Sequence, residues 1–419
     1  MQQPGGELRR GWPVLLASLL GIGCGASPVP FNTFGFFIGP LQQEFGWSLR
    51  DISLGLTLFG VAGALLVPVF GWLADRHGVR PVALGSLAAF GLVFAAFALL
   101  PDSLAVFYAL WVGVGVLGMG STPVTWSRAV NLWFFRQRGL ALGITLVGTS
   151  LAAMLLPPLT VWLIGRFGWR PAFPLLALLP LGLALPVGWW LFREPRPGER
   201  PPELAAGGAA GDALAGLSLA EAARGRRLWL LLASILMIAF AYAGAVVHLP
   251  QMLAGAGYTA PQAASLMSLL GLSVLVGRIG SGLLLDRFWA PLVALPILAL
   301  PAVACLLLAG QDLAPATGAL AVVLLGFSSG TETDLIAYLA GRYFGMAHYG
   351  KVYGFLYMGF ALATSVSPAA YGWVRDATGS YAPMLGVAAA LFVGGALLLP
   401  GLGRYPSLER NRTDSSPAG

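Results

Sequence analysis

The sequence has 419 residues, of which 57% are hydrophobic and only 10% are charged, with a mean hydropathy of +0.79. Soluble domains carry about 25% charged residues, so this composition excludes an ordinary soluble fold and indicates a protein embedded in a membrane. The net charge of +7 does not indicate nucleic-acid binding, because the basic residues lie in short segments between apolar runs rather than on one solvated face.

Apolar runs separated by charges or by Pro and Gly predict the transmembrane helices. A bilayer core about 30 Å thick is crossed by roughly 20 apolar residues in a helix. The first run follows Arg9 and Arg10 without a convincing cleavage site, so we interpret it as a retained helix rather than a signal peptide. The runs fall at 12–37, 52–73, 81–100, 104–128, 138–165, 170–192, 228–252, 261–285, 290–310, 315–340, 351–374 and 381–403. They predict an all-α membrane protein with twelve transmembrane helices.

The segment at 193–227 separates the sixth run from the seventh and differs from both in composition. It contains four prolines, a Gly/Ala-rich stretch and many charges, which is typical of a polar linker with at most one short helix. We therefore predict two six-helix bundles, at 1–192 and 228–403, joined by a cytoplasmic linker and followed by a cytoplasmic tail at 404–419.

The distribution of basic residues predicts the orientation, because short cytoplasmic loops are enriched in Lys and Arg. With both termini in the cytoplasm, the basic residues left on the outer side are Arg50, Arg166, Arg170 and Arg375. Lys351 is the one lysine among 24 basic residues, a bias typical of GC-rich bacterial genomes. We expect a multi-pass protein of a bacterial inner membrane, surrounded by lipid and monomeric.

A repeated motif relates the two bundles. The sequence Gly-Trp-Leu-Ala-Asp-Arg-His-Gly after the second run contains Asp75 and Arg76, and Gly-Leu-Leu-Leu-Asp-Arg-Phe after the eighth contains Asp286 and Arg287. Tandem duplication explains two such motifs at equivalent places. We predict that both motifs lie in loops and gate the cytoplasmic side.

These residues carry a resemblance to the major facilitator superfamily. Its signature between the second and third helices has the pattern Gly-x-Leu-Ala-Asp-Arg-x-Gly, which residues 71–78 match, and the likeness covers nearly the whole chain. A second segment, at 133–148, resembles the fifth-helix signature of monocarboxylate transporters and bacterial oxalate/formate-type relatives. The resemblance implies two pseudo-symmetric six-helix bundles and transport of a substrate bound between them.

Arg278 is the clearest candidate for substrate binding. It lies eight residues before Asp286, about 12 Å deeper along a helix, where a charge is costly and is a functional candidate by default. A guanidinium offers a planar fork that matches a carboxylate. The resemblance implies the same role, since Arg278 coincides with the family's eighth-helix substrate arginine, although Val274 replaces the usual acid one turn earlier. Pairing with an acid inside the bundle is the alternative.

Two acidic residues lie within the tenth run. Glu332 and Asp334 are two positions apart, which is about 200° around a helix, so both cannot face one cavity. We predict that one of them pairs with Arg278 and takes part in proton coupling, because burial disfavours the ionised carboxyl. The alternative is a structural ion pair or a cap at a helix break.

Three further polar residues are candidates for the lining of a substrate cavity. Asn32 lies near Pro28 and Pro30, and broken helices commonly line transporter sites. Tyr242 lies within the seventh run, and His248 ends it near the outer mouth. A simple interfacial role is the alternative for His248. Arg128, near the end of the fourth run, is interpreted as a topology or gate residue.

The sequence contains no Walker loop, metal-ligand cluster or catalytic constellation, so we predict neither an enzyme nor a cofactor. Cys24 and Cys305 lie inside apolar runs and are interpreted as core residues. The expected function is secondary transport of a small organic anion, first a monocarboxylate with a proton, by alternating access. Export of amphipathic compounds, for which Phe31, Phe34, Phe36 and Phe37 would offer an aromatic cavity, and anion exchange are the alternatives.

Overall fold

The computed structural model of the chain describes residues 6–134, 138–195, 216–285, 287–310, 313–345 and 348–406. Within these residues, twelve helical spans are long and apolar enough to cross a membrane, which confirms the predicted all-α membrane fold. Six spans precede the segment 196–215 and six follow it. The predicted linker at 193–227 and the tail at 404–419 lie largely outside the described residues.

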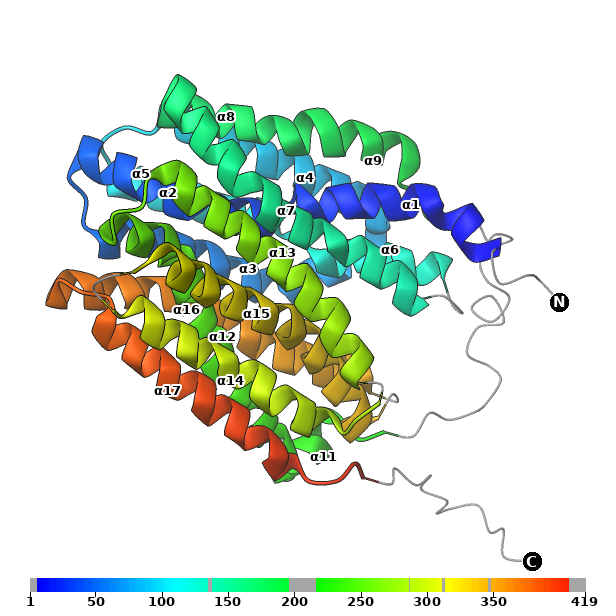
Figure 1. Cartoon of the computed structure of the whole chain (residues 1–419). Helices are drawn as coiled ribbons and strands as arrows, with labels where there is room; N and C mark the ends of the chain where they lie inside the picture. Colours follow the sequence, from blue (N-terminus) through cyan, green and yellow to red (C-terminus); the bar gives the residue numbers. More distant parts are fainter. Residues whose placement is uncertain are drawn as a thin grey trace, which may run out of the picture.

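The helices of the first bundle are α1 (Gly6–Gly23), α2 (Pro28–Phe45), α3 (Leu49–His77), α4 (Val79–Ala96), η1 (Phe97–Leu99), α5 (Leu104–Gly118), η2 (Met119–Ser121), α6 (Pro123–Trp133), α7 (Arg138–Phe167), α8 (Trp169–Leu178), η3 (Leu179–Ala184) and α9 (Leu185–Leu191). Those of the second bundle are α11 (Leu219–Arg224), α12 (Arg226–Gly255), α13 (Ala260–Leu285), α14 (Ala290–Leu308), α15 (Pro315–Phe344), α16 (Tyr349–Thr378), α17 (Ala382–Leu398) and η4 (Leu399–Leu402). Figure 1 shows the first bundle above the second.

Local sequence explains where several helices begin and end. The Ser48 side chain accepts a hydrogen bond from the Asp51 amide and so caps α3. Ser218 and Glu221 form a capping box that starts the short helix α11, the single described helix of the predicted linker. Gly46 and Gly379 end α2 and α16 in the left-handed region, with φ of +69° and +73°, where glycine carries no steric penalty.

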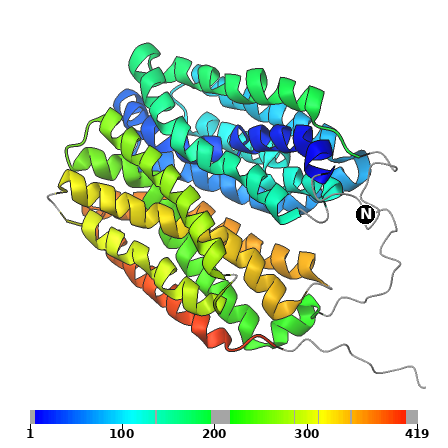
Figure 2. The same cartoon turned by 45° about the vertical axis from the view of Figure 1, so that its right-hand side comes forward.

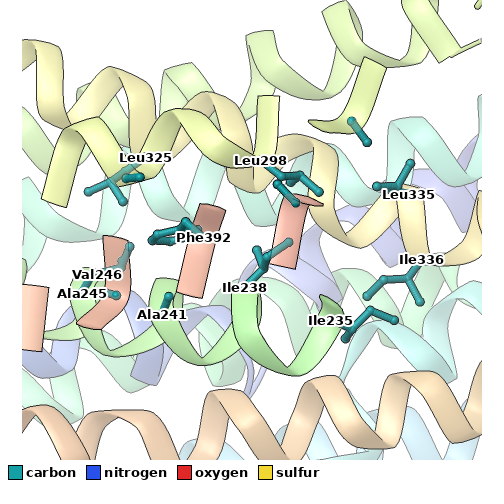
Figure 3. Packing of buried hydrophobic residues seen from close by; sticks show 14 of the residues in the cluster. Ile235, Ile238, Ala241, Ala245, Val246, Leu298, Leu325, Leu335, Ile336 and Phe392 are labelled. Carbon is teal, nitrogen blue, oxygen red and sulfur yellow. The ribbon is translucent and has the colours of Figure 1, made fainter. Parts of the chain in front are cut away.

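Apolar side chains fill each bundle and also cover its outside. In the second bundle Ile235, Ile238, Ala241 and Ala245 recur on one face of α12 and are buried against α14, α15 and α17, as Figure 3 shows. The outer face of α13 exposes an apolar stripe at helical spacing, formed by Leu272, Val276, Ile279 and Leu283. Such a stripe is unfavourable in water and suits contact with lipid chains.

The two bundles lie side by side and share the same two ends. The start of α1, on the right in Figures 1 and 2, and the end of η4, at the lower end of the second bundle, lie at one end of the bundles, which we call the termini side. The turn from α2 to α3, on the left, lies at the opposite end, which we call the far side. The helices that contact across the interface are α2 with α12, α3 with α16, and α7 with α13.

Hydrogen bonds among the described residues join the bundles on the far side, and we call three of them the far-side seal. The bonds run from Gln251 Nε2 to the Gly35 carbonyl (2.9 Å), from Ser268 Oγ to the Met154 carbonyl (2.6 Å) and from the Arg50 amide to Asp376 Oδ2 (2.7 Å). Each bond joins a residue of one bundle to a residue of the other.

Candidate functional site: a cavity between the bundles

Two membrane-spanning segments are broken at the same place in the first bundle. The first segment is interrupted between α1 and α2, and the fourth between α5 and α6. The breaks pack on one another, because the Ala26 amide donates to Ser121 Oγ (3.0 Å) and a side chain on Gly25 would collide with the Ser121 carbonyl. Prolines at the first turns of α2 and α6 fit helix starts, where their missing N–H group costs least.

A cavity of about 520 Å³ lies between the bundles beside these breaks. Its volume is in the range of small-molecule sites. The lining residues are Ser27, Pro28, Phe31, Asn32, Pro123, Ser127, Arg128, Asn131, Leu146, Thr149, Ala153, Tyr242, Val246, Leu270, Val274, Arg278, Ser329, Tyr349, Tyr353, Tyr357 and Phe360. Since Asn131 and Tyr349 lie near the termini-side ends of α6 and α16, the cavity extends from that side toward the middle of the molecule.

Arg278 lies in the wall of this cavity and is held from both bundles. Its Nε is 3.1 Å from Oδ2 of Asp334 on α15, and its Nη1 donates to the Leu146 carbonyl of α7 at 3.2 Å. The side chains of Arg278 and Asp334 are 15% and 36% exposed. Arg278 thus lines the cavity, and Asp334 lies beside it as its ionic partner.

Glycines bring α13 and α15 close enough for this ion pair. A Cβ on Gly277 would collide with the Phe327 carbonyl, and one on Gly330 with the Val274 carbonyl. A Cβ on Gly326 would lie 2.5 Å from the Leu270 carbonyl oxygen. Small residues of this kind let membrane helices approach closely.

Glu332 and Asp334 point in different directions, as their spacing predicts. Asp334 is the acid that pairs with Arg278. Glu332 is 5% exposed, and within the described part of the chain its Oε1 has no hydrogen-bond partner. Tyr242 lies near both Glu332 and Ser329. An ionised, unpaired carboxylate inside a membrane bundle is costly, so this arrangement favours a neutral Glu332.

Asn32 and Tyr242 both line the cavity, from near the start of α2 and from the middle of α12. Asn32 Nδ2 donates to the Pro28 carbonyl at 2.8 Å, which leaves its carbonyl oxygen as an acceptor. Of the four phenylalanines considered for an aromatic cavity, Phe31 lines it, whereas Phe34 and Phe37 are buried in the core of the first bundle.

His248 lies elsewhere than predicted. Helix α12 continues to Gly255, so His248 is inside the helix rather than at its end, and it is fully buried outside the lining of the cavity. The His248 Nε2 atom is 2.9 Å from the Pro368 carbonyl oxygen. Because a carbonyl oxygen can only accept a hydrogen bond, Nε2 carries the ring proton and donates it. The other ring nitrogen, Nδ1, then accepts a hydrogen bond from the Tyr381 hydroxyl at 3.1 Å. Ser53 Oγ, from the first bundle, is 3.4 Å from Nε2. His248 therefore belongs to the interface near the far-side seal.

Comparison with known proteins decides the family. A family model described as the Major Facilitator Superfamily matches residues 20–368. The chain belongs to the major facilitator superfamily. It is thus a membrane transporter and not an enzyme.

The similar proteins named as transporters agree with this family. The chain is 27% identical to human monocarboxylate transporter 11, over 96% of this chain and 85% of that protein, and 29% identical to bovine monocarboxylate transporter 13, over 97% and 91%. A probable sulfoacetate transporter of Cupriavidus necator is 28% identical over 85% and 86%. The crystal structure of a bacterial homologue of the human lysosomal transporter Spinster, inward-facing and unoccupied, has the same fold, with a TM-score of 0.66, 18% identity and 93% of both chains covered.

The superfamily signature lies at the termini side, but within a helix rather than in a loop. Helix α3 runs to His77 and ends at Gly78, whose φ of +88° favours glycine. The guanidinium of Arg76 lies 5.5 Å from the centre of the Trp72 ring. The side chain of Asp75 and all of Asp286 lie outside the described part of the structure, and Arg287 is exposed after the end of α13. The gating role of this motif stays a prediction.

Two groups of cavity-lining residues were not predicted from the sequence to contact the substrate. Arg128, interpreted from the sequence as a gate residue, lines the cavity from α6. The other group is an aromatic ladder on α16, formed by Tyr349, Tyr353, Tyr357 and Phe360, whose successive ring centres are 5.5, 5.8 and 5.6 Å apart. Spacings of four, four and three residues could have identified this face, since they place side chains on one side of a helix.

Proposed function

We propose that this transporter carries a small organic anion, first of all a monocarboxylate, together with a proton. The observation that carries the proposal is Arg278 in the cavity wall, with its charge balanced by Asp334. Among the described residues that line the cavity, the charged ones are Arg128 and Arg278, so the wall favours an anion. The relatives named for monocarboxylates and sulfoacetate support the same substrate class.

The ion pair suggests how a proton accompanies the substrate. The substrate carboxylate takes the place of Asp334 at the Arg278 guanidinium, a planar fork that matches either carboxylate. The released Asp334 carboxyl then takes up a proton, because an unpaired carboxylate is costly at this depth. The empty site holds one positive and one negative charge, and the loaded site holds the same two charges plus a neutral acid. Both states can therefore reorient without moving net charge across the membrane.

Alternating access follows from the placement of the cavity and the seal. The cavity extends to the termini side, which we take to be the cytoplasmic side of a bacterial inner membrane, and the far-side seal closes the other end. Breaking the seal and closing the termini side would expose the same site to the opposite compartment, as in other repeat-built transporters.

Direct binding to purified, folded protein tests the proposal. The parent, Arg278→Lys and Arg9→Lys are compared for binding of lactate and propionate by isothermal titration calorimetry. Arg9 is exposed on α1, so Arg9→Lys controls for the chemical change alone. A lysine offers one nitrogen where Arg278 reaches both Asp334 and Leu146, so we expect binding weaker by roughly ten- to a hundredfold. Equal affinity in all three proteins would refute the anion site.

A further inference from the structure

The cavity continues into a smaller apolar compartment, which we call the side pocket. It has a volume of about 150 Å³ and shares Ser27, Phe31, Pro123, Tyr357 and Phe360 with the main cavity. Its remaining wall includes Leu56, Phe59 and Met119. The side pocket thus lies between α3 and α16 and adjoins the cavity whose wall contains Arg278.

Three hydroxyl groups in the side-pocket wall, those of Thr122, Thr364 and Ser365, donate to nearby backbone carbonyls. Thr122 Oγ1 donates to the Met119 carbonyl at 2.8 Å. Thr364 and Ser365 both donate to the carbonyl of Ala361. These donors are satisfied, so the side pocket offers its occupant mainly apolar and aromatic contacts.

The size and the aromatic lining of the side pocket indicate one kind of occupant. An apolar cavity of about 150 Å³ accommodates a benzene-sized ring. The ladder residues Tyr357 and Phe360 and the opposing Phe31 provide ring faces at the boundary between the two compartments. A two- or three-carbon acid would occupy a small part of the 520 Å³ cavity and would leave these rings without contact.

We propose that the substrate is an aryl or arylalkyl monocarboxylate, whose ring enters the side pocket while its carboxylate binds Arg278. This inference rests on the proposed function for the carboxylate and adds the recognition of the ring. Ring burial strengthens binding in proportion to the apolar area removed from water, so 3-phenylpropionate should bind roughly tenfold or more tightly than propionate.

Binding of propionate, 3-phenylpropionate and 3-phenylpropylamine to the purified full-length protein tests this inference. Phe360→Leu removes a ring from the side pocket, and Phe355→Leu makes the same change on α16 outside the lining of both compartments. Phe360→Leu should weaken phenylpropionate binding by about two- to tenfold more than it weakens propionate binding, because stacking on the ring is lost. Phe355→Leu should leave both acids unchanged. Ala361→Leu, which fills the side pocket, should bring phenylpropionate down to the affinity of propionate.

The outcomes separate the inference from the proposed function. Equal binding of the two acids, or an unchanged ratio in both Phe360→Leu and Ala361→Leu, would overturn the inference and leave carboxylate binding by Arg278 standing. Binding of the amine as tight as that of phenylpropionate would overturn both, because the site would then not select an anion. Binding of neither acid to folded protein would also overturn both. Thermal unfolding of each variant verifies that it is folded.

Discussion

A single methyl group at the far-side seal should shift the balance between the two access states. Gly35 on α2 packs against α12, and a Cβ there would lie 2.6 Å from the Val247 carbonyl oxygen and 2.9 Å from Cγ of Pro250. Ordinary carbon–oxygen contacts are longer, so Gly35→Ala forces the two helices apart in the sealed state. The open far side removes this clash, because α2 and α12 then separate.

Overpacking of this kind costs about 1–3 kcal/mol, and here the cost applies to the sealed state alone. The equilibrium should move toward the state open on the far side by roughly 5- to 150-fold. Gly39→Ala is a matched control, because Gly39 lies one turn further along α2 and its Cβ would meet nothing within 4 Å. Both substitutions gain the same helix propensity of alanine, about 1 kcal/mol, so the control isolates the steric effect.

Spin labels at Gln43 and Ala254, exposed near the far-side ends of α2 and α12, report the opening by double electron–electron resonance. The native Cys24 and Cys305 are buried, and their replacement by serine avoids extra labelling. Gly35→Ala should increase the population at longer distances, whereas Gly39→Ala should reproduce the parent distribution. An unchanged distribution in Gly35→Ala would show that this contact does not hold the far side closed.

Four other substitutions test separate parts of the account. Asp334→Asn should keep exchange of substrate across proteoliposomes but abolish accumulation driven by a pH difference; retained accumulation would remove Asp334 as the proton carrier. Glu332→Gln should leave coupling intact, and loss of pH-driven accumulation in this variant would transfer the role to Glu332. His248→Phe leaves the buried Pro368 carbonyl without its donor, so the free energy of unfolding should fall by about 1–3 kcal/mol while substrate affinity stays near the parent value. Asp75→Asn should slow transport with little change in affinity, and loss of equilibrium binding in the folded variant would contradict a gating role.

The sequence was sufficient for the fold because lipid imposes a simple rule. Each membrane span must form its backbone hydrogen bonds within one helix and expose apolar side chains to lipid. The length and hydropathy of the apolar runs therefore predict twelve helices. The same rule misplaced the end of the fourth span. The fourth span continues from 128, the predicted end, to Trp133, because Arg128 and Asn131 face the cavity instead of lipid. From sequence alone, polar residues near a helix end can indicate either the end of the membrane span or a cavity inside the protein. The structure distinguishes the two, because it shows which neighbours these residues face.

The site was predictable where a charge stands alone in an apolar run. Arg278 and Asp334 were candidates because of their cost in lipid, and the spacing of Glu332 and Asp334 predicted their different faces. His248 carries no such signal, since contacts with Pro368 and Tyr381 come from residues more than 100 positions away. The pairing of Arg278 with Asp334 rather than Glu332 likewise depends on the crossing of α13 and α15, which hydropathy does not specify.

Uptake of a labelled monocarboxylate into proteoliposomes under an imposed pH difference tests the central claim most directly. One-to-one cotransport of a monocarboxylate anion with a proton moves no net charge. It therefore predicts accumulation of the acid toward the alkaline side, up to about tenfold for one pH unit, and no effect of an imposed membrane potential. Initial rates are compared with protein-free vesicles and with Arg278→Lys, because the protonated acid also crosses lipid unaided. Uptake that exceeds both controls and follows the pH difference is the predicted result. Uptake that follows the membrane potential alone, or that equals the rate of the Arg278→Lys vesicles, would contradict proton-coupled transport at Arg278.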